Sequence, residues 1–341
     1  MKLALTLGHW ASGGPPDRAA AQVQAAERLG FESAWTSEVY GSDCFTPLAW
    51  WAKGTRRLKW GTAVCQLSAR TPASTAMTAL TLDHLTGGRF TLGLGVSGPQ
   101  VVEGWYGQPY PRPLQRTREY VDIVRKVFAR ERVEYHGEHY ELPLRGGIGL
   151  GRPIRSIVHP FRADLPIYLA AEGPRNVALA AEIADGWLPL WFSPRLDCHY
   201  RAALAEGFAR TGARRSPDSF EVVCPVSVVI GDDVDACADT LRPLLALYMG
   251  GMGSREANYH KDLFCRLGYE GEARTIQDLY LGGHKDEAAA VLTTAMVEEV
   301  ALVGPPAKIR DELQAWDTTC VTTLAVGGPP EKLAQIGELL P

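Results

Sequence analysis

A glycine motif is the most direct chemical signal in the chain. Residues 93–98 read Gly-Leu-Gly-Val-Ser-Gly and match Gly-x-Gly-x-x-Gly, the pattern that cradles a pyrophosphate in dinucleotide-binding units. In those units the glycines close the first strand and lead directly into a helix. Here they close the fourth apolar run, and residues 99–113, which follow, are dense in glycine, proline and aromatic side chains, as in a loop. The motif therefore predicts close approach of the backbone to a flat ligand, not a nicotinamide dinucleotide site.

Four side chains that can exchange protons follow predicted strands. His9 comes after the first strand and Glu38 after the second, while Glu103 and Tyr106 lie in the loop after the fourth. Imidazole, carboxyl and phenol groups are common general acids and bases in enzymes. Position and residue type make all four candidates for proton transfer, and neither singles one out.

The elements that must position these side chains form a regular series. Short apolar runs alternate with helix-patterned stretches, and the predicted strands are Lys2–Gly8, Ser33–Ser37, Leu58–Val64, Arg89–Gly95, Leu165–Ala171, Trp187–Trp191, Glu221–Ile230 and Val321–Gly327. Eight alternations of strand and helix favour a closed parallel (β/α)8 barrel, the TIM barrel, over an open sheet. The candidates would then gather at the mouth of the barrel, where the strands end.

We expect a single domain over residues 1–341, with insertions after strands 4 and 7. The insertions cover about 97–113, 131–164 and 249–285; a helix over 114–130 leads into a predicted hairpin that turns at Gly137. Long loops on a barrel are usually functional or interfacial.

Composition narrows the class of partner. The net charge is -4 and 46% of the residues are apolar, and no basic run exceeds Arg214-Arg215, so we expect a small-molecule substrate and no nucleic acid. No apolar run approaches the roughly 18 residues of a membrane helix, and the apolar start is too short for a signal peptide. Seven scattered cysteines without Cys-x-x-Cys indicate a cytoplasmic protein. No metal is predicted, because His136 and His139 lack a third ligand nearby.

Five segments carry a family resemblance over essentially the whole chain. They are residues 29–38 (Leu-Gly-Phe-Glu-Ser-Ala-Trp-Thr-Ser-Glu), 61–64 (Gly-Thr-Ala-Val), 87–95 (Gly-Gly-Arg-Phe-Thr-Leu-Gly-Leu-Gly), 170–176 (Ala-Ala-Glu-Gly-Pro-Arg-Asn) and 184–187 (Ala-Asp-Gly-Trp). In their order and spacing the chain resembles the bacterial luciferase-like superfamily. Within it, the chain is most similar to oxidoreductases that use coenzyme F420, an 8-hydroxy-5-deazaflavin.

The resemblance implies a set of cofactor-binding residues. The family has a bulge with a non-proline cis peptide at the end of the third strand, which matches Ala63-Val64 and would support one face of the ring. It places Glu38 near the pyrimidine edge of the ring. Neighbours of the ring or of the ribityl chain, by the same match, are Gln66, Val96, Ser97 and Val101.

The resemblance also implies a phosphate site at a helix start. The matching residues are Glu172, Gly173, Arg175 and Asn176. Free N–H groups and a positive dipole end suit a phosphate there, and Arg175 adds charge. A carboxylate repels a phosphate, so we expect the backbone of Glu172, and not its side chain, to face the anion.

Aromatic side chains near the predicted strand ends are candidates for the substrate site. They are Trp10, Phe45, Trp105, Tyr110 and Trp191, together with Tyr106 and Trp187. Aromatic walls suit a flat or apolar ligand.

The expected function is hydride transfer between coenzyme F420 and a small organic substrate, in a homodimer as is general in the family. Sugar-phosphate oxidation is disfavoured, because Val39 and Gly98 stand where the family's glucose-6-phosphate dehydrogenases have a His and a Glu. Two alternatives stay open: a monooxygenase that uses FMN and dioxygen, and a protein that binds the cofactor without catalysis.

Overall fold

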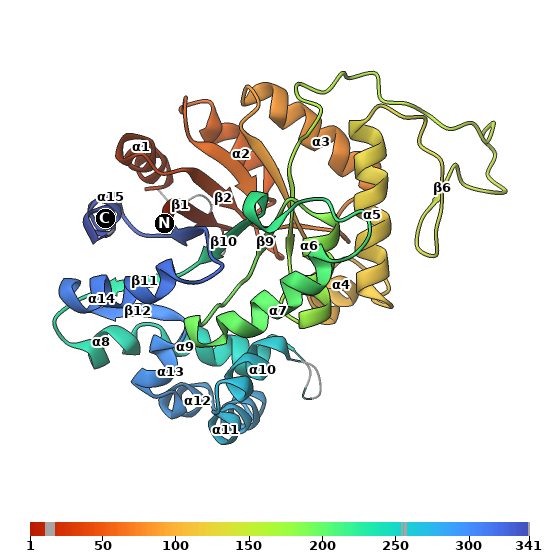
Figure 1. Ribbon diagram of the computed structural model, residues 1–341. Helices are drawn as coiled ribbons and strands as arrows, with labels where there is room; N and C mark the ends of the chain where they lie inside the picture. The colour runs from red at the N-terminus through yellow and green to blue at the C-terminus, as the bar shows by residue number, and fades with distance from the viewer. Residues whose placement is uncertain (11–17, 254, 256–257, 340–341) are drawn as a thin grey trace.

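The computed structural model describes residues 1–10, 18–253, 255 and 258–339, and these form a closed parallel barrel surrounded by helices (Figure 1). The barrel strands are β1 (Lys2–Gly8), β2 (Ser33–Thr36), β3 (Lys59–Thr62), β5 (Phe90–Gly95), β8 (Ile167–Ala170), β9 (Gly186–Leu188), β10 (Glu221–Pro225) and β13 (Thr323–Val326). Consecutive strands pair in this order, β13 pairs with β1, and β3 pairs with β5. The predicted TIM barrel is confirmed.

The helices around the barrel begin and end with local signals. They are α1 (Ala19–Leu29), α2 (Phe45–Ala52), α3 (Pro72–Leu85), α5 (Pro113–Phe128), α6 (Pro174–Ile183), α7 (Asp197–Phe208), α14 (Pro306–Asp317) and α15 (Pro330–Leu339). The helix α1 ends at Gly30, whose φ of 79° is the left-handed conformation that glycine adopts without steric cost. The side chain of Thr71 accepts a hydrogen bond from the N–H of Ser74 and caps α3. None of the helices among the described residues is both long and apolar enough to cross a membrane.

The third strand is interrupted where the sequence predicts a bulge. After β3 the chain bends at Ala63-Val64, whose peptide is cis, and resumes pairing with β5 in the short strand β4 (Cys65–Gln66). The predicted cis bond is confirmed.

The seventh predicted strand, Glu221–Ile230, is wrong as a single element. The structure divides it at Val226 into β10 in the barrel wall and β11 (Ser227–Ile230), which pairs outside the barrel with β12 (Ala301–Gly304). The pairing of β10 with β13 ends with Pro225 opposite Ala325 and one further hydrogen bond, from the N–H of Val226 to the carbonyl oxygen of Ala325. The strand β12 was not predicted, although the run Ala-Leu-Val-Gly before Pro305 has the composition of a buried strand.

The insertion after β11 is helical and longer than predicted. Its helices are α8 (Val234–Asp239), α9 (Arg242–Ala246), a π-helix over Leu247–Gly251, α10 (Tyr259–Arg266), α11 (Glu270–Leu281), α12 (Lys285–Val291) and α13 (Thr294–Glu298). In Figure 1 they form a separate layer beside α7, at the bottom of the view.

The other insertions match the predictions in part. The segment after α5 contains the expected hairpin, β6 (Tyr135–His136) against β7 (Glu141–Leu142), and extends away from the barrel in Figure 1. The predicted loop over 97–113 contains a short helix, α4 (Pro99–Gly104), which begins with a proline at a position where its missing N–H costs nothing.

Aromatic side chains fill the interior of the barrel on the side where the strands begin. Trp35 stacks on Tyr168 with ring centroids 5.8 Å apart, and the indole N–H of Trp35 donates to the hydroxyl of Ser33. The indole lies across Gly61, where a Cβ atom would stand 2.2 Å from the ring of Trp35, so only glycine fits there. The base of the barrel is therefore closed by side chains.

Candidate functional site

Small side chains form the floor of the barrel mouth. Ala63, Val64 and Ala170 pack on the interior cluster that contains Trp35 and Leu188, and yet each of the three remains partly exposed. Their position above the aromatic layer gives an apolar surface at the ends of β3 and β8. A flat ring system can lie on such a surface without meeting a polar group.

The glycines of the motif in β5 have a structural role that the sequence does not reveal. A Cβ atom at Gly93 would stand 1.7 Å from the carbonyl oxygen of Thr62, and one at Gly95 would stand 2.5 Å from the side chain of Val64. The close approach predicted for a flat ligand is thus made by the neighbouring strand at these two positions. The sequence interpretation of Gly93 and Gly95 as ligand contacts is corrected accordingly.

Glu38 lies at the centre of a buried polar network at the end of β2. One carboxylate oxygen accepts hydrogen bonds from the N–H of Gln66 at 3.0 Å and from Arg70 at 2.6 Å, and the other accepts from the N–H of Cys44 at 3.2 Å. Glu38 is 5% exposed. Because both oxygens have donors, the geometry favours a positioning role for Glu38, although it was proposed above as a proton-transfer group.

Gln66 has an acceptor without a partner. Its amide nitrogen donates to the carbonyl oxygens of Glu38 and Val39, at 3.1 and 3.3 Å, while its Oε1 is buried and has no hydrogen-bond partner among the described residues. Buried polar atoms are nearly always paired in native proteins, so this unpaired oxygen offers a place for a ligand atom or a water molecule. Oε1 of Gln66 is suited to receive an N–H group.

Glu38, Cys44 and Cys65 bring three metal-ligating atoms within 4.8 Å of one another. The guanidinium of Arg70, which bonds Glu38 and lies 3.7 Å from Sγ of Cys65, already supplies a positive charge at this place. We assign no metal to the group.

The predicted phosphate residues lie together at the start of α6. The N–H groups of Asn176 and Val177 bond the carbonyl oxygen of Gly173, so the N–H of Arg175 is left over in the first turn, and its exposed side chain forms no ion pair with any described residue. The side-chain amide of Asn176 donates to the carbonyl oxygen of Ala170 at 3.4 Å, which ties the helix start to β8.

Glu172 directs its carboxyl group away from the first turn of α6. Its Oε1 accepts the N–H of Leu190 at 2.8 Å, in the loop that follows β9. Burial raises the pKa of this carboxyl to about 8, against the hydrogen bond from Leu190 and the charge of Arg266, which lower it. The raised pKa favours the neutral form of the group, which reduces its repulsion of a nearby anion.

The other proton-transfer candidates differ in their hydrogen bonds and in their exposure to solvent. The hydroxyl of Tyr106 donates to the carbonyl oxygen of Val39 at 3.1 Å, and burial raises its pKa to about 12. His9 is exposed, with Nδ1 3.3 Å from the hydroxyl of Ser37. Glu103 is exposed on α4.

The predicted substrate aromatics separate into two groups. Trp10 lies edge-on to Trp51 at 6.1 Å and Trp105 is 64% exposed at the end of α4, while Trp191, after β9, is 9% exposed and packs against Tyr248 and His260. Phe45 instead lies in the core, 6% exposed and packed against Phe90, because it forms the inner face of α2. Trp187 is likewise buried against Phe192 and Tyr200, outside the mouth.

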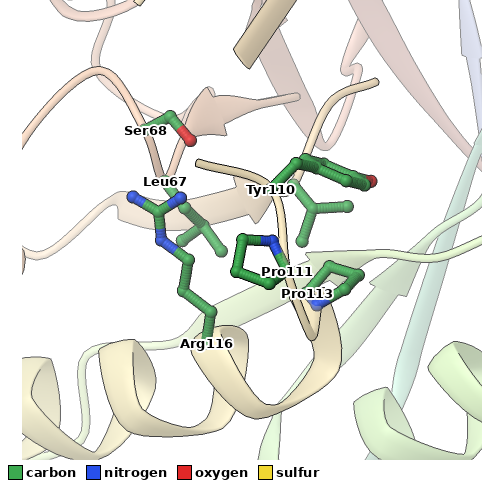
Figure 2. A pocket seen from close by; sticks show the side chains of 7 residues that line it. Leu67, Ser68, Tyr110, Pro111, Pro113 and Arg116 are labelled. Carbon is green, nitrogen blue, oxygen red and sulfur yellow. The ribbon is translucent and has the colours of Figure 1, made fainter. Parts of the chain in front are cut away.

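The chain after β5 borders a small pocket. Tyr110 donates to the carbonyl oxygen of Ser97, which has a positive φ of 59°, and Val101 is half-buried in α4. Figure 2 shows Arg116 extending from the start of α5 toward the segment with Leu67 and Ser68. The pocket is lined by Leu67, Ser68, Val96, Tyr110, Pro111, Pro113 and Arg116.

Sequence reasoning missed Arg70 and the aromatic residues of the insertion. Arg70 lies four residues after Gln66 and pairs with Glu38, a contact that only the folded loop reveals. The ring centroids of Tyr248 and His260 lie 4.9 and 5.1 Å, respectively, from the ring centroid of Trp191. The only sequence signal was the density of aromatic and glycine residues in the insertion.

The family model of the luciferase-like monooxygenases matches residues 4–323 of this chain. The chain belongs to this family. The predicted family is confirmed.

Two relatives by sequence and one by structure illustrate the membership. A protein of Mycobacterium tuberculosis, whose name proposes that it is a coenzyme F420-dependent oxidoreductase, is 52% identical over 100% of this chain and 99% of its own. The 5,10-methylenetetrahydromethanopterin reductase of Archaeoglobus fulgidus is 28% identical over 92% of this chain and 91% of its own. The structure of a coenzyme F420-dependent tetrahydromethanopterin reductase from Methanopyrus kandleri superposes with a TM-score of 0.81 and 23% identity, over 99% and 97% of the two chains. This last likeness shows the fold.

Proposed function

We propose that the protein is an oxidoreductase that transfers a hydride between coenzyme F420 and a small organic substrate. The observation that carries the proposal is the unpaired Oε1 of Gln66, buried beside the apolar floor at Ala63 and Val64. The 52% identity to a relative named for this cofactor supports the choice among tricyclic cofactors.

The residues at the mouth fit a deazaflavin. The pyrimidine edge of such a ring carries an N–H between two carbonyl groups, and Oε1 of Gln66 would accept that N–H. Ala63 and Val64 would support one face of the ring. The first turn of α6, with the free N–H and guanidinium of Arg175, would hold the phosphate.

The bound cofactor would supply the hydride chemistry at its ring carbon. The chain's own contribution is to orient the ring, to exclude water and to hold a proton near the substrate. Glu38 and Arg70 fix Gln66, while Tyr106 and His9 are the candidates for the proton. Burial raises the pKa of Tyr106 to about 12 and its hydroxyl proton is donated to the carbonyl oxygen of Val39, so Tyr106 would have to leave Val39 to act as a donor.

A titration with both cofactors tests the proposal. Coenzyme F420 should bind more tightly than FMN, and the bound reduced F420 should survive in air. Tighter binding of FMN with rapid oxygen consumption by the reduced complex would assign the protein to the monooxygenases. Tight binding of F420 without hydride transfer to or from any compound of a broad panel would favour a protein that binds the cofactor without catalysis.

We also propose a cytoplasmic homodimer of single-domain chains. All seven cysteines are free in the structure, in keeping with a reducing compartment. The segment after β7 exposes several large apolar side chains: Leu144, Ile148, Leu150, Ile154 and Ile157 are 70 to 110% exposed. Such an apolar surface on an extended segment supports association with a second chain.

A further inference from the structure

The start of α10 is held over the barrel mouth by a buried asparagine. The side chain of Asn258, 1% exposed, accepts the N–H groups of His260 and Lys261 at 3.0 Å and so caps the helix. Its amide nitrogen donates to the carbonyl oxygens of Tyr248 and Met249 at 3.0 and 2.8 Å. One side chain thus fixes α10 against the π-helix, and local π-helical turns are frequent at functional sites.

This part of the insertion reaches the loops that follow several barrel strands. A Cβ atom at Gly173 would stand 3.7 Å from the ring of Tyr259, which places the start of α10 over the start of α6. Burial raises the pKa of Tyr110, and the neighbouring Tyr259 raises it further, so the two phenol groups lie near each other. The insertion therefore contributes directly to the mouth.

His260 projects from this fixed position into an aromatic frame. Its ring centroid is 5.1 Å from that of Trp191 and 5.0 Å from that of Tyr248, and Phe264 packs edge-on to Trp191 at 6.2 Å. Nδ1 of His260 is buried and has no hydrogen-bond partner among the described residues, whereas Nε2, also without a partner there, is not enclosed. Buried N–H groups without a partner are rarer in native proteins than buried acceptors without one, so we place the proton on Nε2.

The imidazole is also neutral. Burial lowers the pKa of His260 to about 4, and no carboxylate of the described residues pairs with it. A neutral imidazole donates one hydrogen bond but offers no charge to an anion.

We propose that His260 binds the substrate through Nε2–H, and that the substrate is an uncharged carbonyl compound whose apolar body lies against Trp191 and Tyr248. The inference rests on the proposed function, which supplies the ring beside which the carbonyl group must lie. A phosphorylated or carboxylated substrate would find no countercharge in this frame. The same hydrogen bond strengthens if negative charge develops on the carbonyl oxygen.

The test measures binding to the F420-saturated protein by calorimetry, with cyclohexanone and cyclohexanecarboxylate as probes of equal ring size. We expect cyclohexanone to bind at least about 10-fold more tightly, and His260→Phe, which retains an aromatic ring, to weaken it about 5- to 20-fold, the effect of one lost hydrogen bond. His260→Gln retains an N–H donor and should stay within about 3-fold of the wild type. His284→Ala, at an exposed histidine before α12, is the matched control.

Three results would overturn the inference: no binding of cyclohexanone by the wild type, equal binding of the two probes, or equal affinity in His260→Phe. Loss of F420 affinity in His260→Phe would also overturn it, by showing that His260 supports the cofactor site instead. If the wild type takes up FMN and not F420, the proposed function fails, and the same comparison in the FMN-loaded protein still decides the role of His260.

Discussion

Nη1 of Arg70 lies 2.6 Å from Oε1 of Glu38, and this ion pair joins the ends of two neighbouring barrel strands. The side chain of Glu38 is 4% exposed and that of Arg70 is 22% exposed. The carboxylate also accepts the backbone N–H of Gln66, so the pair fixes the main chain that carries the side chain of Gln66.

Removing the cation should leave a buried carboxylate without its charge partner. Arg70→Met is therefore expected to lower the free energy of unfolding by about 3 kcal/mol, measured by urea denaturation. The double variant Arg70→Met/Glu38→Leu should lose less than the sum of the two single changes. Lys59→Met, which breaks the exposed pair with Glu32, serves as the control and should cost about 1 kcal/mol or less. If Arg70→Met and Lys59→Met lower the free energy of unfolding equally, the pair of Arg70 and Glu38 does not behave as a buried ion pair.

Arg175 should contribute to cofactor affinity through its charge. We expect Arg175→Ala to weaken binding of F420 by about 1 to 3 kcal/mol, the range of a lost charge-assisted hydrogen bond, as followed by cofactor fluorescence. Arg274→Ala, at an exposed arginine of α11, should leave the affinity unchanged. If both variants bind F420 as the wild type does, the phosphate lies elsewhere.

Ala63 should tolerate no larger side chain when the cofactor binds. Ala63→Leu places additional carbon atoms on the floor of the mouth, where the ring would lie, and should abolish cofactor binding. Overpacking should cost the fold only about 1 to 3 kcal/mol, so circular dichroism should show a folded protein. Retained F420 binding in the folded variant would remove Ala63 from the site.

Glu172 should make stability depend on pH. Its pKa is about 8 in the folded chain and 4.5 as a free group, so between these values the folded state holds more protons than the unfolded state. The free energy of unfolding should therefore fall as pH rises from about 4.5 to 8. Glu172→Gln keeps an acceptor for Leu190 but does not titrate; it should match the wild type at about pH 5 and exceed its stability by about 1 kcal/mol or more at about pH 9. Parallel stability profiles of the two proteins would show that Glu172 titrates normally.

The exposed apolar segment after β7 should control association. Light scattering at micromolar concentration is expected to give the mass of a dimer, and obligate dimers commonly bury more than about 2,000 Å². Replacing Ile148, Leu150 and Ile157 together by serine should shift the mass toward the monomer without unfolding the barrel. A monomeric wild type that binds F420 fully would refute the dimer, and an unchanged dimer in the variant would place the interface elsewhere.

The alternation of apolar runs and turn residues was sufficient to predict the barrel. Strand identity follows from local composition, which is why seven strands were found near their observed positions. The division of the run Glu221–Ile230 was not predictable, because β11 leaves the barrel to pair with β12, about 70 residues later in the chain. Such a long-range pairing overrides local pattern.

The backbone of the candidate site was predictable only where a family motif fixes its conformation. The segment around Gly173 and the cis bond at Ala63-Val64 belong to this class. The pairing of Arg70 with Glu38, and the approach of His260 to Trp191, depend on loops whose conformations the sequence does not encode locally. Phe45 was assigned to the mouth because residue type cannot distinguish a lining ring from a core ring.

The stacked rings of Trp35 and Tyr168 have a consequence for the kinetics of the enzyme. Because they close the base of the barrel among the described residues, a ligand would reach the floor at Ala63 and Val64 from the carboxyl ends of the strands. A tricyclic ring lying on Ala63 and Val64 would be covered by whatever binds above it. Turnover should then follow a compulsory order, in which the cofactor enters first and departs last.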